Sequence, residues 1–222
     1  MGSLLISLLP YIIGSALVPV QNIINILLLR SPRQGLLKAT AYVSGMTIVR
    51  LLQGLIFGLI FVKEAGGGKS PIVLTLQLVL GILLLVTAYK QWRKEDDPDA
   101  PPPKWLTMID SLTTLKSFGF GFGILIISGK AWVFTLSAIG LIAEAELGQP
   151  SSTIAYLLFV LLTESLLLLT ILFRVIIPEK SKTFLEQASA WLTHYNRPIV
   201  ILVSLVFGLF FLYQGASGLL NL

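Results

Sequence analysis

Residues 72–89 of the chain read IVLTLQLVLGILLLVTAY and contain no Asp, Glu, Lys or Arg. A helix needs about 20 mostly apolar residues to cross the hydrocarbon core of a bilayer. We therefore predict a membrane-spanning helix over residues 72–91. Similar runs predict five more spans, over residues 4–29, 36–62, 117–142, 153–177 and 198–220. The expected fold is an all-α membrane protein with six transmembrane helices.

The composition of the whole chain supports this fold class. Of the 222 residues, 55% are hydrophobic and 12% are charged, whereas soluble domains carry about 25% charged residues. The chain has no Cys and one His, His194. Thiolate nucleophiles and Cys-based metal sites are thereby excluded, and a His cluster or a Ser-His-Asp triad has no basis. We expect no enzyme activity, no metal and no cofactor.

The net charge of +5 is better explained by membrane orientation than by nucleic-acid binding, because no basic stripe with interleaved aromatic residues lies outside the loops. Most Lys and Arg residues fall in the first, third and fifth loops, whereas the loop between the second and third spans holds only Lys63 and Lys69. Cytoplasmic loops carry an excess of Lys and Arg. We therefore predict a multi-pass protein of the plasma (inner) membrane with both termini on the non-cytoplasmic side.

Two loop segments place apolar residues at helical spacing and are predicted to lie in the plane of the membrane interface. The first belongs to the linker 93–116 and contains Trp105, Met108, Leu112 and Leu115. The second follows the fifth span and contains Phe184, Ala188, Trp191 and Tyr195. In the second segment, Thr183 and Glu186 form a capping-box pattern that predicts a helix start. A partner-binding role is the alternative for both segments.

The second half of the chain resembles the first. Residues 78–85, LVLGILLL, are similar to residues 205–212, LVFGLFFL, and an Ala-Tyr pair precedes Arg50 and Glu164 at the same spacing. Matching Gly14 to Gly123 places Gln21 opposite Lys130. Apolar helices also align by chance, but the pattern predicts two three-helix repeats, 1–92 and 117–222, joined by the cytoplasmic linker 93–116. An odd number of helices per repeat makes the halves inverted, a transporter design with its site at the midplane.

Three charged residues fall near the centres of predicted spans: Arg50, Lys130 and Glu164. Each costs about 2.5–3.5 kcal/mol at a helix centre on insertion scales, so such residues normally face a partner or a water-filled cavity. Their similar depth predicts one cluster with a formal charge of +1, which favours a cargo carrying a carboxylate or a phosphate. Glu164 is the only acid at that depth and is therefore the candidate proton carrier.

The polar residues of the first span add to this cluster. Gln21, Asn22 and Asn25 lie three and four residues apart, share a helix face and are predicted to hydrogen-bond the cargo, while Arg50 and Lys130 hold its anionic group. Pro19 lacks an amide N–H and frees a carbonyl of the preceding turn. Ser128-Gly129, just before Lys130, is a second place for a helix break, and breaks at corresponding positions indicate a transport site.

A structural role is the alternative for the same charges. Arg50 and Glu164 could form a buried ion pair that only fixes helix packing, which would leave Lys130 without a partner.

Several stretches resemble the glycolipid-addressing (GAP, or Sap-like) family of the LysE-type translocator superfamily. They are Ala16-Leu17-Val18-Pro19, Pro32-Arg33-x-Gly35-Leu36 with Gly45 beyond it, Leu80-Gly81, Ala88-x-x-Gln91-Trp92-Arg93, Pro103-Lys104-Trp105, Asp110-Ser111-Leu112 and Lys130. Family members often have Asn-Pro-Lys where this chain has Ser128-Gly129-Lys130. The resemblance implies a LysE-like fold of inverted three-helix repeats. It also implies export of small solutes, or help in moving lipid-linked molecules to the surface.

The predicted function is a secondary transporter or exporter of a small anionic or zwitterionic solute or a lipid-linked molecule, proton-coupled through Glu164. Its partners would be the lipid bilayer and this cargo, with no nucleic acid, and a homo-oligomer is left open. The rival prediction is a non-transporting scaffold or assembly factor. In that case the central charges only hold the helices together, and the amphipathic segments form the functional surface.

Overall fold

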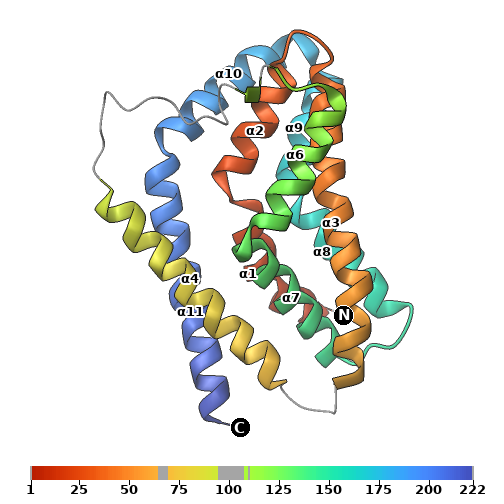
Figure 1. Cartoon of the computed structure of the whole chain (residues 1–222), viewed down its shortest axis with the longest axis vertical. Helices are drawn as coiled ribbons and strands as arrows, with labels where there is room; N and C mark the ends of the chain where they lie inside the picture. The colour runs from red at the N-terminus through yellow and green to blue at the C-terminus, as the bar shows by residue number, and fades with distance from the viewer. Residues whose placement is uncertain (1, 65–69, 95–107, 110, 222) are drawn as a thin grey trace.

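The computed structural model describes residues 2–64, 70–94, 108–109 and 111–221, and within these ranges all regular structure is helical (Figure 1). Three single helices are long and apolar enough to cross a membrane: α3 (Gly35–Glu64), α4 (Pro71–Arg93) and α11 (Asn196–Leu220). They correspond to the predicted second, third and sixth spans.

The other three predicted spans are bent pairs of shorter helices. The pairs are α1 (Gly2–Ala16) with α2 (Pro19–Arg30) at 58°, α6 (Thr114–Ile127) with α7 (Gly129–Glu144) at 74°, and α8 (Ser151–Thr163) with α9 (Ser165–Ile176) at 62°. If each pair is one span, the described residues provide six candidate crossings. The all-helical fold is therefore confirmed, and the described residues hold three to six candidate membrane spans.

Local sequence explains the first two breaks. Pro19 is the first residue of α2, a position at which the backbone N–H makes no bond within the helix, so proline is tolerated there. Val18 before it is extended (φ −74°, ψ 105°), as is usual for a residue before proline. Ser128 separates α6 from α7 and accepts a hydrogen bond from the backbone N–H of Ala131, as an N-cap does. The break predicted at Ser128-Gly129 is confirmed.

The third break has no such signal in the sequence. Glu164 lies between α8 and α9 with φ −94° and ψ 3°, and no Gly or Pro occurs between Ser151 and Ile177. Most sharp kinks arise at Pro, at Gly or where a side chain disturbs the helix ladder. The sequence predicted a span over residues 153–177 but gave no indication of a break within it.

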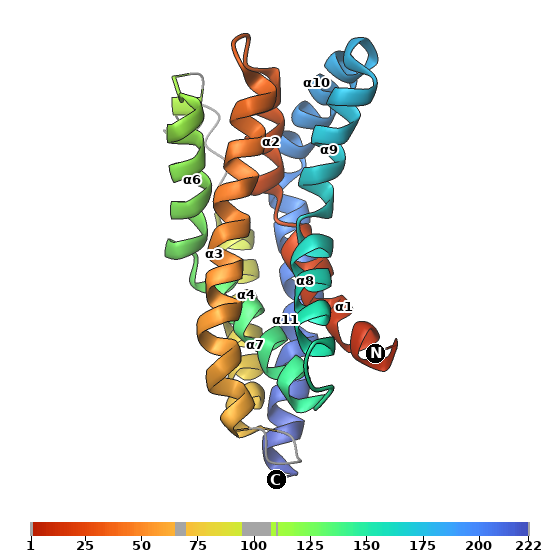
Figure 2. The same ribbon diagram turned by 90° about the vertical axis from the view of Figure 1, so that its right-hand side faces the viewer.

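Helix α10 (Pro178–His194) crosses one end of the molecule and packs against α2, α9 and α11 (Figures 1 and 2). It buries Leu185 and exposes Phe184 and Trp191, so the predicted amphipathic helix is confirmed. Its start was predicted wrongly. The helix begins at Pro178, which suits the first helical position, and Thr183 therefore lies inside the helix rather than at its cap.

The predicted interfacial segment of the linker is described only in part, since Trp105 lies outside the described residues. Leu112 is buried, whereas Met108 and Leu115 are exposed. Helix α6 begins only at Thr114. The helical spacing predicted across Leu112 and Leu115 therefore does not apply.

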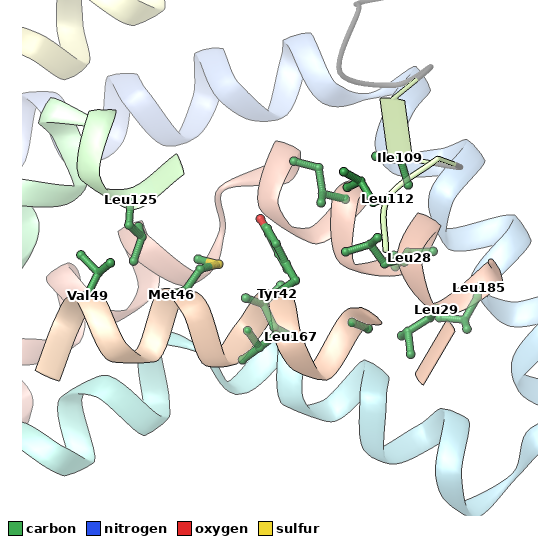
Figure 3. Packing of buried hydrophobic residues seen from close by; sticks show 14 residues of the cluster. Leu28, Leu29, Tyr42, Met46, Val49, Ile109, Leu112, Leu125, Leu167 and Leu185 are labelled. Atoms are coloured by element: carbon green, nitrogen blue, oxygen red, sulfur yellow. The ribbon is translucent and has the colours of Figure 1, made fainter. Parts of the chain in front are cut away.

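Among the described residues, the buried apolar side chains form two large clusters and a small third one of Phe61, Val73 and Ile139. The cluster near α10 includes Leu28, Tyr42, Met46, Leu125, Leu167 and Leu185 (Figure 3). The second cluster includes Leu8, Tyr11, Phe134, Phe159 and Phe211. Helices α2, α6 and α9 contribute to the first cluster, and α1, α7 and α8 contribute to the second. Each bent pair thus passes from one apolar cluster to the other at its break.

Helices α4 and α11 run side by side along one flank of the molecule (Figure 1). A Cβ added to Gly81 would lie 2.5 Å from the backbone N of Leu212, and one added to Gly208 would lie 2.9 Å from the side chain of Leu85. Small residues at an interface let two helices approach closely. The contacts are reciprocal, because each glycine meets the leucine that lies four residues beyond the other glycine.

We predict that Gly81→Ala destabilises the protein by about 1–3 kcal/mol, the usual cost of overpacking, because the backbone of α11 must move. The melting temperature in lipid nanodiscs, followed by tryptophan fluorescence, measures this effect. Gly119→Ala is the matched control, since nothing lies within 4 Å of a Cβ added there. Equal melting temperatures for the two variants would contradict the close approach of α4 and α11.

Candidate functional site

A buried ion pair joins two of the predicted site residues. The Nε atom of Arg50 on α3 lies 3.3 Å from Oε1 of Glu164 at the α8–α9 break, and the two residues are only 1% and 2% exposed. Thr47 donates a hydrogen bond of 2.6 Å to Oε2 of Glu164, and Arg50 donates one of 3.1 Å to the hydroxyl of Thr135 on α7. Buried charges are tolerated only with such partners. The network therefore fastens α3 to α7 and to the third break.

A cavity of about 90 Å³ lies at the other two breaks. Three of the predicted site residues line it: Gln21, Arg50 and Lys130. Val203 and Ser204 of α11 also line it. A single water needs about 10–15 Å³ of such space, so the cavity has room for several waters or for one small polar group.

Lys130 lies in the first turn of α7 and is half-buried. Its Nζ atom is 3.5 Å from the hydroxyl of Thr87 on α4. Within the part of the chain that the structure describes, no carboxylate lies within ion-pair distance of this amine. Because a charge at this depth is costly without a counter-charge, Lys130 favours water or an anion in the cavity.

Two helix N-termini add to the positive potential of the cavity. Helix α2 starts at Pro19 without a side-chain cap, and α7 starts at Gly129; Pro19 and Ser128 both line the cavity. The first-turn N–H groups of a helix have no helical partner and form the positive end of its dipole, which suits an anion. The arrangement places two such ends and one lysine around a single small space.

Buried polar groups in the same wall lack protein partners. Gln21 is 8% exposed and lines the cavity, and its side chain has no hydrogen bond to any described residue. The hydroxyl of Ser15, which also lines the cavity, is buried without a hydrogen bond among those residues. Buried polar groups are normally satisfied. Gln21 and Ser15 are therefore placed to bind a polar ligand group or water.

Asn22 and Asn25 point to other parts of the structure. The Nδ2 atom of Asn22 donates to the carbonyls of Ala16 and Val18, both at 3.0 Å. Nδ2 of Asn25 donates to the carbonyl of Leu167 at 3.1 Å and to Thr170 at 2.8 Å. Neither asparagine lines the cavity. Asn22 thus satisfies backbone carbonyls at the α1–α2 break, and Asn25 links α2 to α9.

Sequence reasoning missed several members of the site. Thr47 lies three residues before Arg50 and so shares its helix face, a signal that was present in the sequence. Thr135, Ser15 and Ser204 enter the site only because α7, α1 and α11 meet there. A single sequence carries no signal for such tertiary contacts.

We predict that Arg50→Met alone lowers the free energy of unfolding by about 3–5 kcal/mol, because it leaves the Glu164 carboxylate buried without its counter-charge. The double variant Arg50→Met with Glu164→Leu should recover most of this loss, since both charges are then gone. Equilibrium unfolding in mixed micelles measures the difference. A double variant as unstable as the single one would contradict the pairing.

Comparison with known proteins gives one match, which spans nearly the whole chain. A family model described as "Sap, sulfolipid-1-addressing protein" matches residues 8–217, a range that includes all three breaks and the charges at Arg50, Lys130 and Glu164. No curated protein and no solved structure matches the chain.

Proposed function

We propose that this chain, which belongs to the Sap, sulfolipid-1-addressing protein family, is a membrane transporter or exporter for a molecule with an anionic group. The family description links the chain to lipid handling, and its apolar helices fit a multi-pass membrane protein. The observation that carries the proposal is the cavity at the α1–α2 and α6–α7 breaks, where Lys130 and two helix N-termini meet and no carboxylate of a described residue neutralises the lysine.

The charges of the cavity favour an anion over a cation. Glu164 balances the charge of Arg50, so Lys130 and the two helix dipoles leave the space positive. A carboxylate, a phosphate or a sulfate ester suits this space. The cargo is a small anionic or zwitterionic solute or a lipid-linked molecule, and the sulfolipid in the family's description is a molecule of the latter kind.

Contacts between matched positions support two inverted three-helix repeats and a LysE-like fold. The sequence match pairs Gly81 with Gly208, and the reciprocal contacts of these glycines are those expected next to a two-fold axis. Arg50 and Glu164 are matched and form an ion pair. In both halves the first span is broken, whereas α3 is continuous and its counterpart α8–α9 is bent. The site thus lies between the halves, as in transporters with inverted repeats.

Proton coupling follows from the position of Arg50 between Glu164 and the cavity. A proton on Glu164 removes the negative charge that holds Arg50, and the guanidinium then becomes the second cation for the cargo. Loss of that proton restores the ion pair and releases the anion. One carboxylate therefore links binding of the cargo to binding of a proton, while the two halves rock between inward-open and outward-open states.

The membrane orientation is part of the proposal. The basic first and fifth loops lie at the α10 end, and the start of α1 and the end of α11 lie toward the other end (Figures 1 and 2). With the Lys- and Arg-rich end in the cytoplasm of a plasma membrane, the chain termini lie on the non-cytoplasmic side.

A scaffold is the rival function, and the exposed Phe184 and Trp191 of α10 favour it. A scaffold needs the central charges only for stability, so it should keep its function when Arg50 and Glu164 are replaced together by apolar residues. A transporter should lose all transport in the same double variant, even when its melting temperature is normal.

Transport of the cargo is tested in proteoliposomes with amino acids, organic anions and anionic lipids, with and without a pH gradient. Lys130→Met should lower the rate about tenfold or more, because a charge-assisted hydrogen bond contributes about 1.5–3 kcal/mol. Lys116→Met on the exposed surface of α6 is the matched control and should keep the rate. Equal rates for the two variants, or no transport of any compound by the unmodified protein, would contradict the proposal.

The proton-carrier role of Glu164 has its own test. Glu164→Gln keeps the size of the side chain and its ability to accept from Thr47, but it cannot release a proton. Its transport should no longer respond to a pH gradient imposed at constant membrane potential. If Glu164→Gln responds to the gradient as the unmodified protein does, Glu164 is not the proton carrier.

A further inference from the structure

A second, larger cavity borders the α1–α2 break. This groove has a volume of about 620 Å³ and lies between α2, α9 and α10. Its walls include Ile26, Leu169, Phe173, Ala188 and Trp191. Almost the entire lining is hydrocarbon or aromatic, which differs from the lining of the small cavity with Lys130, Arg50 and Gln21.

The two polar residues of the groove have protein partners. The amide of Asn22 donates to the carbonyls of Ala16 and Val18. The hydroxyl of Thr170 donates to the carbonyl of Leu167 and accepts from Asn25. A polar solute would therefore find little to bond in the groove, whereas an apolar chain would leave no buried polar group unsatisfied.

The groove and the small cavity are neighbours. Leu17 and Pro19, the residues on either side of the first break, line both spaces. On α11 the adjacent residues Ile199 and Val200 border the groove and the cavity, respectively. One elongated ligand can therefore occupy both spaces, with its charged end beside Lys130 and its apolar end beside α10.

We infer that the groove is the acyl-chain subsite for the same cargo whose anionic head lies in the small cavity, and that this cargo enters sideways from the bilayer between α2 and α10. The inference rests on the proposed function and narrows its cargo to one class of molecule, an amphiphile with a carboxylate, phosphate or sulfate head. The charge of the cavity, the apolar walls of the groove and their shared residues carry it. A soluble anion would use only the first space.

The experiment uses the full chain in phosphatidylcholine nanodiscs and a dodecyl phosphate with a photoreactive diazirine at the end of its chain. After irradiation, mass spectrometry maps the adducts to peptides. Adducts should concentrate on α9 and α10 around Phe173 and Ala188. Lys130→Met should lower their yield about tenfold, because a tail bound together with its head depends on the head-group charge.

Two matched pairs of variants test the groove itself. Ala188→Phe fills the groove, whereas Ala190→Phe places the same ring on the exposed side of α10. Leu169→Trp and Leu172→Trp form the second pair, since both leucines are exposed on α9 but only Leu169 lines the groove. The filling variant of each pair should lose about tenfold in adduct yield, and its control should lose none.

Two results would overturn the inference. Adducts spread evenly over the exposed faces of α4 and α11, or equal yields within both pairs, would mean that the groove holds ordinary bilayer lipid. Transport of butyl phosphate and dodecyl phosphate separates this outcome from failure of the proposed function. Equal transport of both, unaffected by Ala188→Phe, refutes the subsite and leaves the transporter standing. Transport of neither of these two, nor of any compound in the proteoliposome screen, refutes the transporter and the subsite with it.

Discussion

The ion pair between Arg50 and Glu164 is the interaction on which the rest of the molecule depends. Hydrocarbon offers no partner for either charge, so each residue is stable within the membrane only when it faces a counter-charge or a polar interior. Their meeting, with Thr47 and Thr135 as further partners, ties α3 to α7 and to the junction of α8 with α9. It lies at the α8–α9 break, where this bent pair passes from one large apolar cluster to the other.

The three helix breaks lie at that level for a related reason. A broken helix leaves backbone groups without partners, and within a membrane such groups are tolerated only where protein or a cavity satisfies them. Asn22 bonds the carbonyls released at the first break, Ser128 caps the helix that follows the second, and the third is formed by Glu164 itself. The start of α2 and the side chain of Gln21 have no such partner among the described residues, and both border the cavity. The helix breaks therefore have two effects: they leave backbone groups without helical partners, and they provide groups that can bind a ligand.

Energetic penalties made part of this structure predictable. The cost of ions in hydrocarbon predicted that Arg50 and Glu164 meet, and the chemistry of Ser128-Gly129 predicted the break before Lys130. The resemblance to Sap-like proteins, made from scattered motifs, was confirmed by the family match, whereas membership of the LysE-type superfamily and the LysE-like repeat remain predictions. The break at Glu164 could not be predicted, because no Gly or Pro marks it and the partners of Glu164 at the break, Arg50 and Thr47, lie on a helix that is distant in the sequence. Asn22 and Asn25 were predicted to bind the cargo from their helical spacing alone, which carries no sign that Asn22 bonds the carbonyls of Ala16 and Val18 or that Asn25 bonds Thr170 and Leu167 of α9.

We propose that these charges surround a water-filled cavity and do not form a dry ion pair in a closed bundle. The chain contains no cysteine, so a single cysteine at Gln21 can be labelled without background, using a charged thiosulfonate reagent that does not enter lipid. We predict that this cysteine reacts from at least one face of the membrane, whereas one at Leu55, 67% exposed on the apolar surface of α3, does not. A cysteine at Gln21 that stays unlabelled from both faces, in a protein of normal stability, would contradict the account.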